Sequence, residues 1–154
     1  MAIYSLKEVY DTTPERLFAL LTDPDRLLEW MPPEFGLSWL EQPEKWSVGT
    51  VFSLQARRWG LSVRLVHEVV AWHWPSHFAE RQQRGPFRSW QREWHLQAQA
   101  GQTLMQETIT LEPPGGMLGQ FWTLAHIEAD IQAGWRYREQ QLRACLTKAA
   151  KEHP

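Results

Sequence analysis

The chain has a single cysteine, Cys145, among its 154 residues, so an internal disulfide is excluded. Its net charge is only −2 at pH 7, with a pI near 6.3, which gives no overall field to attract nucleic acid or an anionic membrane. The N-terminal residues lack the long apolar region of a signal peptide, and no apolar run reaches transmembrane length. We therefore expect a soluble cytoplasmic protein with no nucleic-acid partner and no membrane insertion.

No linker, low-complexity segment or internal repeat interrupts the chain. A length of 154 residues suits one domain, and a hydrophobic content of 43% is enough to build its core without covalent crosslinks. We therefore predict a single domain over residues 1–154, present as a monomer or homodimer.

Tryptophan is abundant, with ten residues spread along the chain at no fixed period. One explanation is that the indoles are large apolar filler of a core, and another is that several of them line an open pocket. The two explanations are compatible, and both stay open.

The segment 85–116 has the most informative pattern. Bulky residues and one charge occupy every second position of its first half, and therefore one face of a strand: Trp90, Arg92, Trp94 and Leu96. The second half repeats the alternation after a turn around Gly101: Met105, Glu107, Ile109 and Leu111. The pattern predicts an antiparallel hairpin with one bulky apolar face.

A turn closed by Ala98 and Thr103 sets the register of this hairpin and places Trp94 opposite Glu107. Arg92 is then diagonal to Glu107, at roughly 7–8 Å between backbones, which a long side chain can bridge. Burying either charge alone costs several kcal/mol. We therefore expect the two charges to pair, or to meet water or a ligand inside a cavity.

The N-terminal half reads as a strand over residues 3–10, then a helix that begins at Pro14 behind a Thr12 or Thr13 cap. A second short helix is predicted to start at Asp23-Pro24 and to stop at Pro32-Pro33. Four further strands are predicted between turn signals, over residues 35–41, 50–57, 61–71 and 76–83.

A helical period predicts one long amphipathic helix over residues 120–151. Its inward stripe is Leu124, Ile127, Ile131, Trp135, Arg138, Leu142 and Cys145. Arg138 is expected to pair with a strand carboxylate or a ligand, and Cys145 to be a buried structural thiol with no basic neighbour. The glycine-rich segment 113–119 lacks the lysine of a phosphate-binding loop and is interpreted as the turn before this helix.

Histidines offer weaker candidates for chemistry. His67 shares the register of its apolar strand neighbours and is expected to line a cavity rather than to catalyse. His73 and His77 flank a proline turn, and no third ligand is near them in sequence, so no metal site is predicted. His126 and Asp130 are one helical turn apart and are interpreted as an exposed pair.

Several motifs together resemble the START-like ligand-binding superfamily, also called SRPBCC, over nearly the whole chain. They are Tyr-Asp-Thr-Thr-Pro-Glu-Arg-Leu-Phe at 10–18, Trp30 with Pro32, Phe-Ala-Glu at 78–80, Gly-Pro-Phe at 85–87 with Trp90, Gly-Gln-Thr at 101–103 with Glu107, Pro-Pro-Gly-Gly at 113–116, and Trp-Arg-Tyr-Arg at 135–138 with Leu142. The most similar members are small bacterial proteins often described as polyketide cyclase- or dehydrase-like.

The resemblance implies an α+β helix-grip fold. In this fold a curved antiparallel sheet of six or seven strands wraps a long C-terminal helix, and two short helices after the first strand close one end of a deep cavity. Many similar proteins carry histidines in the strand after Gly-Pro-Phe, where this chain has Arg92 and Trp94, and Asp where it has Glu107. Their histidine-based chemistry is therefore not expected here, whereas Glu80 and Glu107 keep a polar spot in the cavity.

Three functions remain open. The leading hypothesis is a carrier or sensor that binds a small hydrophobic molecule, lipid-, aromatic- or polyketide-like, without a cofactor. The second is a cyclase, dehydratase or hydrolase in which Glu107, with a raised pKa, or His67 is the general base and Arg92 stabilises an enolate-like oxygen. The third is a protein-interaction module with a surface patch of exposed indoles.

The sequence favours binding over catalysis and assigns neither a catalytic residue nor a metal ligand. The side chains predicted to line the cavity and contact the ligand are His67, Glu80, Trp90, Arg92, Trp94, Met105, Glu107, Ile109, Ile131, Trp135 and Arg138.

Overall fold

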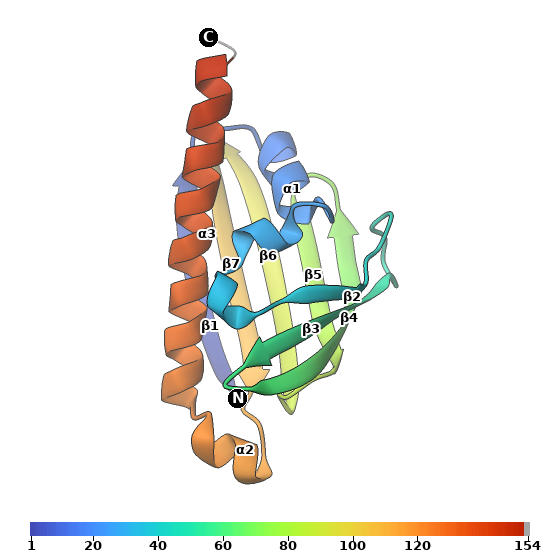
Figure 1. Cartoon of the computed structure of the whole chain (residues 1–154). Coiled ribbons are helices and arrows are strands. Elements are labelled where there is room, and N and C mark those ends of the chain that lie inside the picture. Colours follow the sequence, from blue (N-terminus) through green and yellow to red (C-terminus); the bar gives the residue numbers. More distant parts are fainter. Residues whose placement is uncertain (153–154) are drawn as a thin grey trace.

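The computed structural model describes residues 1–152 and contains one antiparallel sheet with the strand order β1-β7-β6-β5-β4-β3-β2. Its strands are β1 (Ala2–Tyr10), β2 (Ser38–Glu41), β3 (Val51–Arg58), β4 (Leu61–His73), β5 (His77–Arg84), β6 (Ser89–Gln99) and β7 (Gln102–Glu112). The strands β2 to β7 follow one another as neighbours, and β1 closes the order by pairing with β7. The sheet is curved, as Figure 1 shows, and the predicted helix-grip architecture is confirmed.

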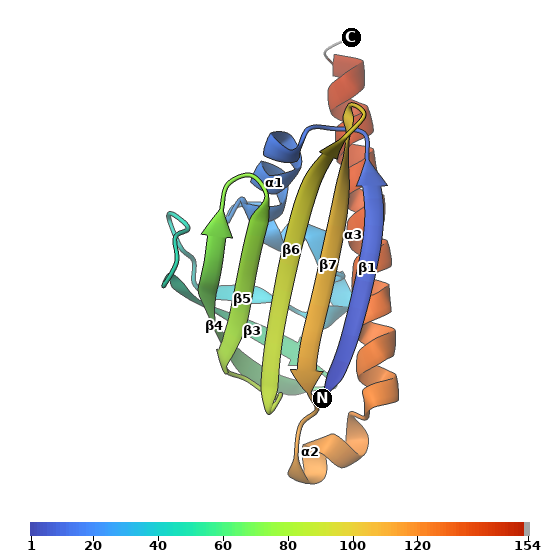
Figure 2. The same ribbon diagram turned by 180° about the vertical axis from the view of Figure 1, so that it is seen from behind.

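The long C-terminal helix and the helices that follow β1 lie on one face of this sheet. The long helix α3 (Leu124–Glu152) runs along the face toward which β2 and β3 curl, beside α1 (Pro14–Thr22) and the short 3₁₀ helices η1 (Leu27–Trp30) and η2 (Pro33–Phe35) (Figure 1). Within residues 1–152, no helix covers the opposite face of the sheet (Figure 2). The core therefore lies between the sheet and the helices.

The predicted start of α1 is confirmed. The Thr13 side chain accepts a hydrogen bond from the Arg16 backbone N–H at 3.2 Å, and Pro14 occupies the first turn. The helix buries Leu17, Phe18 and Leu21. The second predicted helix exists only as the 3₁₀ turn η1, and η2 begins at Pro33 where the sequence predicted a strand from residue 35. The strand β2 consequently starts three residues later than predicted.

The predicted hairpin register is also confirmed. Ala98 pairs with Thr103 and Trp94 with Glu107, and the ladder continues one pair beyond Ala98. Ala100 and Gly101 form the two-residue turn and have φ values of 49° and 82°. Positive φ at both turn positions matches the right-handed twist of the flanking strands, so the turn itself sets the register.

The C-terminal region differs from the prediction. Residues 113–119 are not only a turn, because a separate short helix, α2 (Gly116–Phe121), precedes α3. The Thr123 hydroxyl accepts a hydrogen bond from the His126 backbone N–H at 3.5 Å, and the Thr123 carbonyl accepts one from Ile127 at 2.9 Å. Thr123 thus caps a new helix, and the break before it divides what the sequence predicted as one helix over 120–151.

Two apolar clusters form the core, and a polar segment separates them. On β7, Met105 belongs to the cluster beside α1, and Ile109 belongs to the other cluster, with Glu107 between them. On α3, Leu142 belongs to the cluster beside α1 and Ile131 to the other, with Arg138 between them. The same order on the strand and on the helix brings the two buried charges to the same level of the fold.

Gly36 joins η2 to the sheet at a close backbone contact. Its φ is +59°, its carbonyl accepts a hydrogen bond from Arg57 N–H at 3.2 Å, and a Cβ added to it would lie 2.3 Å from the Arg57 carbonyl oxygen. A side chain at this position would therefore push η2 away from β3.

The substitution Gly36→Ala should destabilise the protein more than Gly60→Ala. Both positions have positive φ, which costs an L-residue about 1–2 kcal/mol, but a Cβ on Gly60 would meet no atom within 4 Å. We expect the extra loss at Gly36 to be at least about 1 kcal/mol in the free energy of unfolding measured by urea denaturation. Equal losses would contradict the close contact.

Candidate functional site

A cavity of about 260 Å³ lies between the sheet and α3. Its wall is mostly apolar and includes six indoles: Trp30, Trp59, Trp90, Trp94, Trp122 and Trp135. At the β3–β4 turn, Trp59 and Leu61 are 65% and 58% exposed, so the cavity reaches the surface there. Other indoles, such as Trp46 and Trp72, pack edge-on against Phe78 instead and fill the core.

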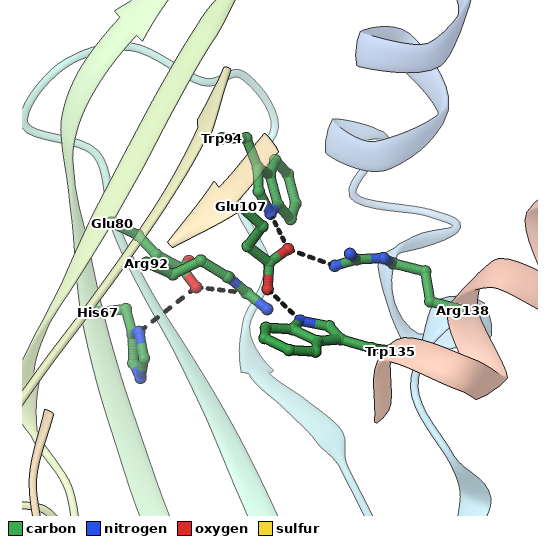
Figure 3. Close-up of polar contacts among 7 residues, drawn as sticks. All are labelled: His67, Glu80, Arg92, Trp94, Glu107, Trp135 and Arg138. Atoms are coloured by element: carbon green, nitrogen blue, oxygen red, sulfur yellow. Dashed lines mark hydrogen bonds and ion pairs between the residues drawn. The ribbon is translucent and has the colours of Figure 1, made fainter. Parts of the chain in front are cut away.

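Glu107 is the centre of a buried polar cluster in this cavity (Figure 3). Its carboxylate accepts hydrogen bonds from the indole N–H of Trp94, from that of Trp135 at 2.5 Å and from Nη1 of Arg138 at 2.7 Å. Trp94 comes from the neighbouring strand β6, and the other two donors come from α3. The prediction that Arg138 pairs with a strand carboxylate is confirmed.

Arg92 pairs with Glu80 rather than with Glu107. Its Nη2 donates to Glu80 Oε1, and its guanidinium also lies over the Trp94 ring at 5.1 Å. The predicted diagonal pair is therefore wrong, because Glu80 on β5 is directly opposite Arg92 and a direct cross-strand neighbour is nearer than a diagonal one. His67 on β4 lies beside the pair, with its Nδ1 3.9 Å from Glu80 Oε1 (Figure 3).

The charges in the cluster stabilise one another. Burial raises the pKa of Glu107. The charges of Arg138 and Arg92, together with the hydrogen bonds from Trp135 and Arg138, outweigh this effect and hold that pKa below its ordinary value. Burial lowers the pKa of Arg92, but Glu80 and Glu107 outweigh it and hold that pKa above its ordinary value. Both groups are ionised at neutral pH.

His67 is neutral at neutral pH. Burial lowers its pKa, and although the charge of Glu80 opposes this effect, the charge of Arg92 adds to it. With two carboxylates, two guanidinium groups and a neutral imidazole, the cluster carries no net formal charge.

Several buried nitrogens of residues that border the cavity have no hydrogen-bond partner among the residues that the structure describes. They are Nε of Arg92, Nε and Nη2 of Arg138, Nε1 of Trp90 and Nδ1 of His67. All but the imidazole nitrogen are obligate donors. Four of these buried nitrogens are therefore donors that lack an acceptor in the described part of the chain.

Ten of the predicted site residues border the cavity: His67, Glu80, Trp90, Arg92, Trp94, Glu107, Ile109, Ile131, Trp135 and Arg138. Met105 does not. It faces the same side of β7, but it lies beside α1, where Leu96 and Leu142 fill the space around it. Strand alternation predicts the face of the sheet on which a side chain lies. It does not predict where along the strand the cavity ends and the packed core begins.

The structure separates the predicted pair His126 and Asp130. His126 contacts Thr123, whereas Asp130 accepts hydrogen bonds from Arg58 at 2.6 Å and from the Trp122 indole at 3.0 Å. Asp130 thereby connects the β3–β4 turn to the start of α3 at the edge of the cavity. Arg58 was not among the predicted site residues, and the one signal for it in the sequence is its position next to Trp59 at the turn.

Cys145 also differs from the prediction. It is half-buried and has a basic neighbour, because Nη2 of Arg26 lies 3.4 Å from its sulfur. Arg26 comes from the segment before η1, far away in sequence, so no local pattern could reveal the contact.

Comparison with known proteins gives a family match over most of the chain. The family model described as polyketide cyclase/dehydrase and lipid transport matches residues 11–144. A comparison with curated proteins finds no match. None of the helices among residues 1–152 is long and apolar enough to cross a membrane.

Solved structures with a similar fold cover nearly the whole chain. The protein TTHA0849 from Thermus thermophilus has a TM-score of 0.71 and 16% identity, over 94% of this chain and 99% of that one. Ara h 8.0201 has a TM-score of 0.61 and 16% identity, over 90% and 97%. CalU16 from Micromonospora echinospora has a TM-score of 0.60 and 13% identity, over 97% and 82%. Identities this low show the fold alone.

The substitution Glu107→Gln should destabilise the protein strongly, because it leaves the Arg138 guanidinium buried without a counter-ion. We expect a loss of roughly 3–5 kcal/mol in the free energy of unfolding measured by urea denaturation. Glu44→Gln, at an exposed loop position, is the matched control and should change it by less than about 0.5 kcal/mol. Adding Arg138→Met to Glu107→Gln should recover part of the loss. A Glu107→Gln protein as stable as the control would contradict the role of the pair.

His67 should make the protein less stable in mild acid. Its folded pKa lies below the ordinary value of 6.5, so the unfolded chain binds the proton first, and stability falls as the pH is lowered through 6.5 toward the folded pKa. Urea midpoints at about pH 7.5 and about pH 5, on either side of the ordinary histidine pKa, measure this loss. His67→Gln should lose less than the wild type, and the exposed-residue control His126→Gln should lose as much as the wild type. Equal losses in all three proteins would exclude His67 as the source.

Proposed function

The chain belongs to the polyketide cyclase/dehydrase and lipid transport family, as the START-like resemblance predicted, and from this we propose that it binds a small, mostly apolar molecule with a neutral hydrogen-bond acceptor. The observation that carries the proposal is the set of unpartnered N–H donors in the cavity wall, among the residues that the structure describes. The proposed role is that of a carrier or sensor.

The apolar part of the ligand would fit the cavity volume and wall. A space of about 260 Å³ suits a small polycyclic or short-chain molecule. Ile109 from β7, Ile131 from α3 and the indole of Trp90 provide the apolar surface against which such a molecule packs. Flat indole surfaces favour an aromatic or polyketide-like body, because offset stacking adds to apolar burial.

The polar part of the ligand would meet the free donors. A buried donor without a partner costs about 1–3 kcal/mol, and a ligand oxygen placed near Nε of Arg92 or Nη2 of Arg138 recovers that cost. A group that only donates hydrogen bonds would find Glu107 already occupied by its three donors and Oε1 of Glu80 by Arg92. The unpartnered donors therefore favour a ligand that carries an acceptor.

A neutral acceptor fits better than an anion. Glu80 and Glu107 balance Arg92 and Arg138, and the neutral His67 adds no charge, so a ligand carboxylate would bring an unbalanced charge into a buried site. A ketone, ester or amide oxygen accepts the same hydrogen bonds without that cost. We therefore expect carbonyl compounds to bind more tightly than the corresponding acids.

Catalysis by Glu107 is disfavoured on the same grounds. A general base needs a pKa near the working pH, whereas the pKa of Glu107 is held below its ordinary value and three donors already use its lone pairs. His67 remains the one base of the catalytic hypothesis that is neutral and faces the cavity.

An interaction module built on an indole patch is also disfavoured. The most exposed indoles among the described residues are those of Trp59 and Trp74, at 65% and 52%. Trp59 precedes β4 and Trp74 follows it, so they lie at opposite ends of a long strand and do not form one patch.

A series of naphthalenes tests the chemistry of the proposed ligand. The series is 2-acetylnaphthalene, which has a neutral acceptor, 2-ethylnaphthalene, which has none, and 2-naphthoate, which is an anion. Isothermal titration calorimetry should show that the ketone binds roughly tenfold more tightly than the hydrocarbon, since one hydrogen bond is worth about that much. The anion should bind more weakly than the ketone. Equal affinity for the ketone and the hydrocarbon would contradict the acceptor preference. If none of the three compounds binds, the cavity is not a binding site for molecules of this class.

The substitution Arg92→Lys should weaken binding of the ketone selectively. Lysine keeps the positive charge beside Glu80 but removes the Nε–H donor. We expect a several-fold loss of affinity for 2-acetylnaphthalene with the affinity for 2-ethylnaphthalene nearly unchanged. Arg57→Lys, at an exposed position of β3, is the matched control and should change neither. Parallel losses for both compounds would mean that Arg92 acts through packing alone.

A further inference from the structure

A cluster of potential metal ligands lies on the outer face of the sheet, opposite the cavity. Glu93 and His95 are two residues apart on β6 and therefore share a face, and His77 on β5 is directly opposite His95. Their neighbours Trp94 and Phe78 are buried on the inner side. Figure 2 shows this outer face, where no helix of residues 1–152 covers β5 and β6.

The three side chains converge on one point. Nε2 of His77 lies 2.7 Å from Glu93 Oε1, and Nε2 of His95 lies 2.8 Å from the same oxygen. The two imidazole rings are stacked, with centroids 4.3 Å apart and planes 8° apart, and both Nε2 atoms are directed at the same carboxylate oxygen. One ligand atom from each residue lies within 4.8 Å of the other two.

This donor set is one that zinc prefers. Zinc binds imidazole nitrogen and carboxylate oxygen at about 2.0–2.2 Å, and two histidines with one glutamate form a known three-ligand set that leaves the fourth position to water. In a tetrahedral site neighbouring ligand atoms are about 3.3 Å apart, so the carboxylate would have to withdraw from each nitrogen by only about 0.5 Å. The cation would bind Nε2 of each neutral imidazole, with the ring proton on Nδ1, and would take the place of the two hydrogen bonds that now hold the cluster together.

We propose that His77, Glu93 and His95 form a binding site for one zinc ion on the outer face of β5 and β6. The side chains of His77 and Glu93 are 24% and 34% exposed, and that of His95 is 56% exposed, so a cation and its water ligand can reach the site. His73 stacks on His77 at 5.6 Å from the next strand. It orients that ring from the side away from His95 and is not needed as a ligand.

A zinc ion at this place would crosslink β5 to β6 behind the inner wall of the cavity. On the inner side the same two strands carry Glu80 and Arg92, the directly paired charges of the polar cluster. The site would therefore stabilise the strand pair that positions this ion pair. The metal proposal does not depend on the proposed ligand, because its residues face away from the cavity.

Metal titration of the full chain without a histidine tag tests the site. After treatment with a chelator, Co²⁺ should bind as one ion per chain and give visible d–d absorption bands, which Zn²⁺ should abolish by displacement. Isothermal titration calorimetry with Zn²⁺ should give one site per chain. Zinc should also raise the melting temperature, because it binds the folded state.

The variants His77→Gln, His95→Gln and Glu93→Gln should each weaken zinc binding at least about tenfold. His126→Gln removes an exposed histidine from α3 and is the matched control, with unchanged affinity expected. Circular dichroism of the zinc-free proteins shows whether each variant is folded. The proposal is overturned if the wild type binds no zinc, or if binding survives in the folded variants of all three residues; in either case the cluster is only a carboxylate hydrogen-bonded by two imidazoles.

Discussion

The need to satisfy one buried carboxylate organises this protein. Glu107 lies on β7, between β1 and β6, with almost no exposed surface, and it cannot stay ionised there without donors. The donors come from two elements, the Trp94 indole on β6 and the Trp135 indole and Arg138 guanidinium on α3. Apolar packing alone permits a helix to slide or rotate over a sheet, whereas these directional bonds fix one position of α3 along β7.

The cavity follows from that position. The polar cluster lies between two apolar clusters, one packed tightly under α1 and the other along the first half of α3. Charged side chains that are already paired do not collapse against each other as aliphatic side chains do, so the space beside them stays open and is bordered by indoles. The same cluster leaves several donors without partners, and these donors are the basis of the ligand selectivity in the proposed function.

Local patterns predicted the elements whose causes are local. The two-residue alternation and the Ala100-Gly101 turn determine the hairpin register, and the Thr13-Pro14 pair determines the start of α1. The break before α3 was missed, because the helical period continues through Trp122 and Thr123 and only the Thr123 cap interrupts it. The curvature of the sheet and the helix-grip arrangement were predicted from the family resemblance. The hydrophobic period of a single strand or helix does not specify them.

The sequence by itself determined which residues face inward, and thereby that Arg92, Glu107 and Arg138 are charges directed toward a common interior. Only the tertiary structure decided their partners: Arg92 bonds Glu80 on β5 and not Glu107, and Met105 is packed into the core while Ile109 borders the cavity. It also decided that His77 contacts Glu93 and His95 on β6, in addition to its sequence neighbour His73. The physical reason is that periodicity specifies the direction of a side chain, whereas pairing depends on strand order and on distances of a few ångströms between segments far apart in the chain.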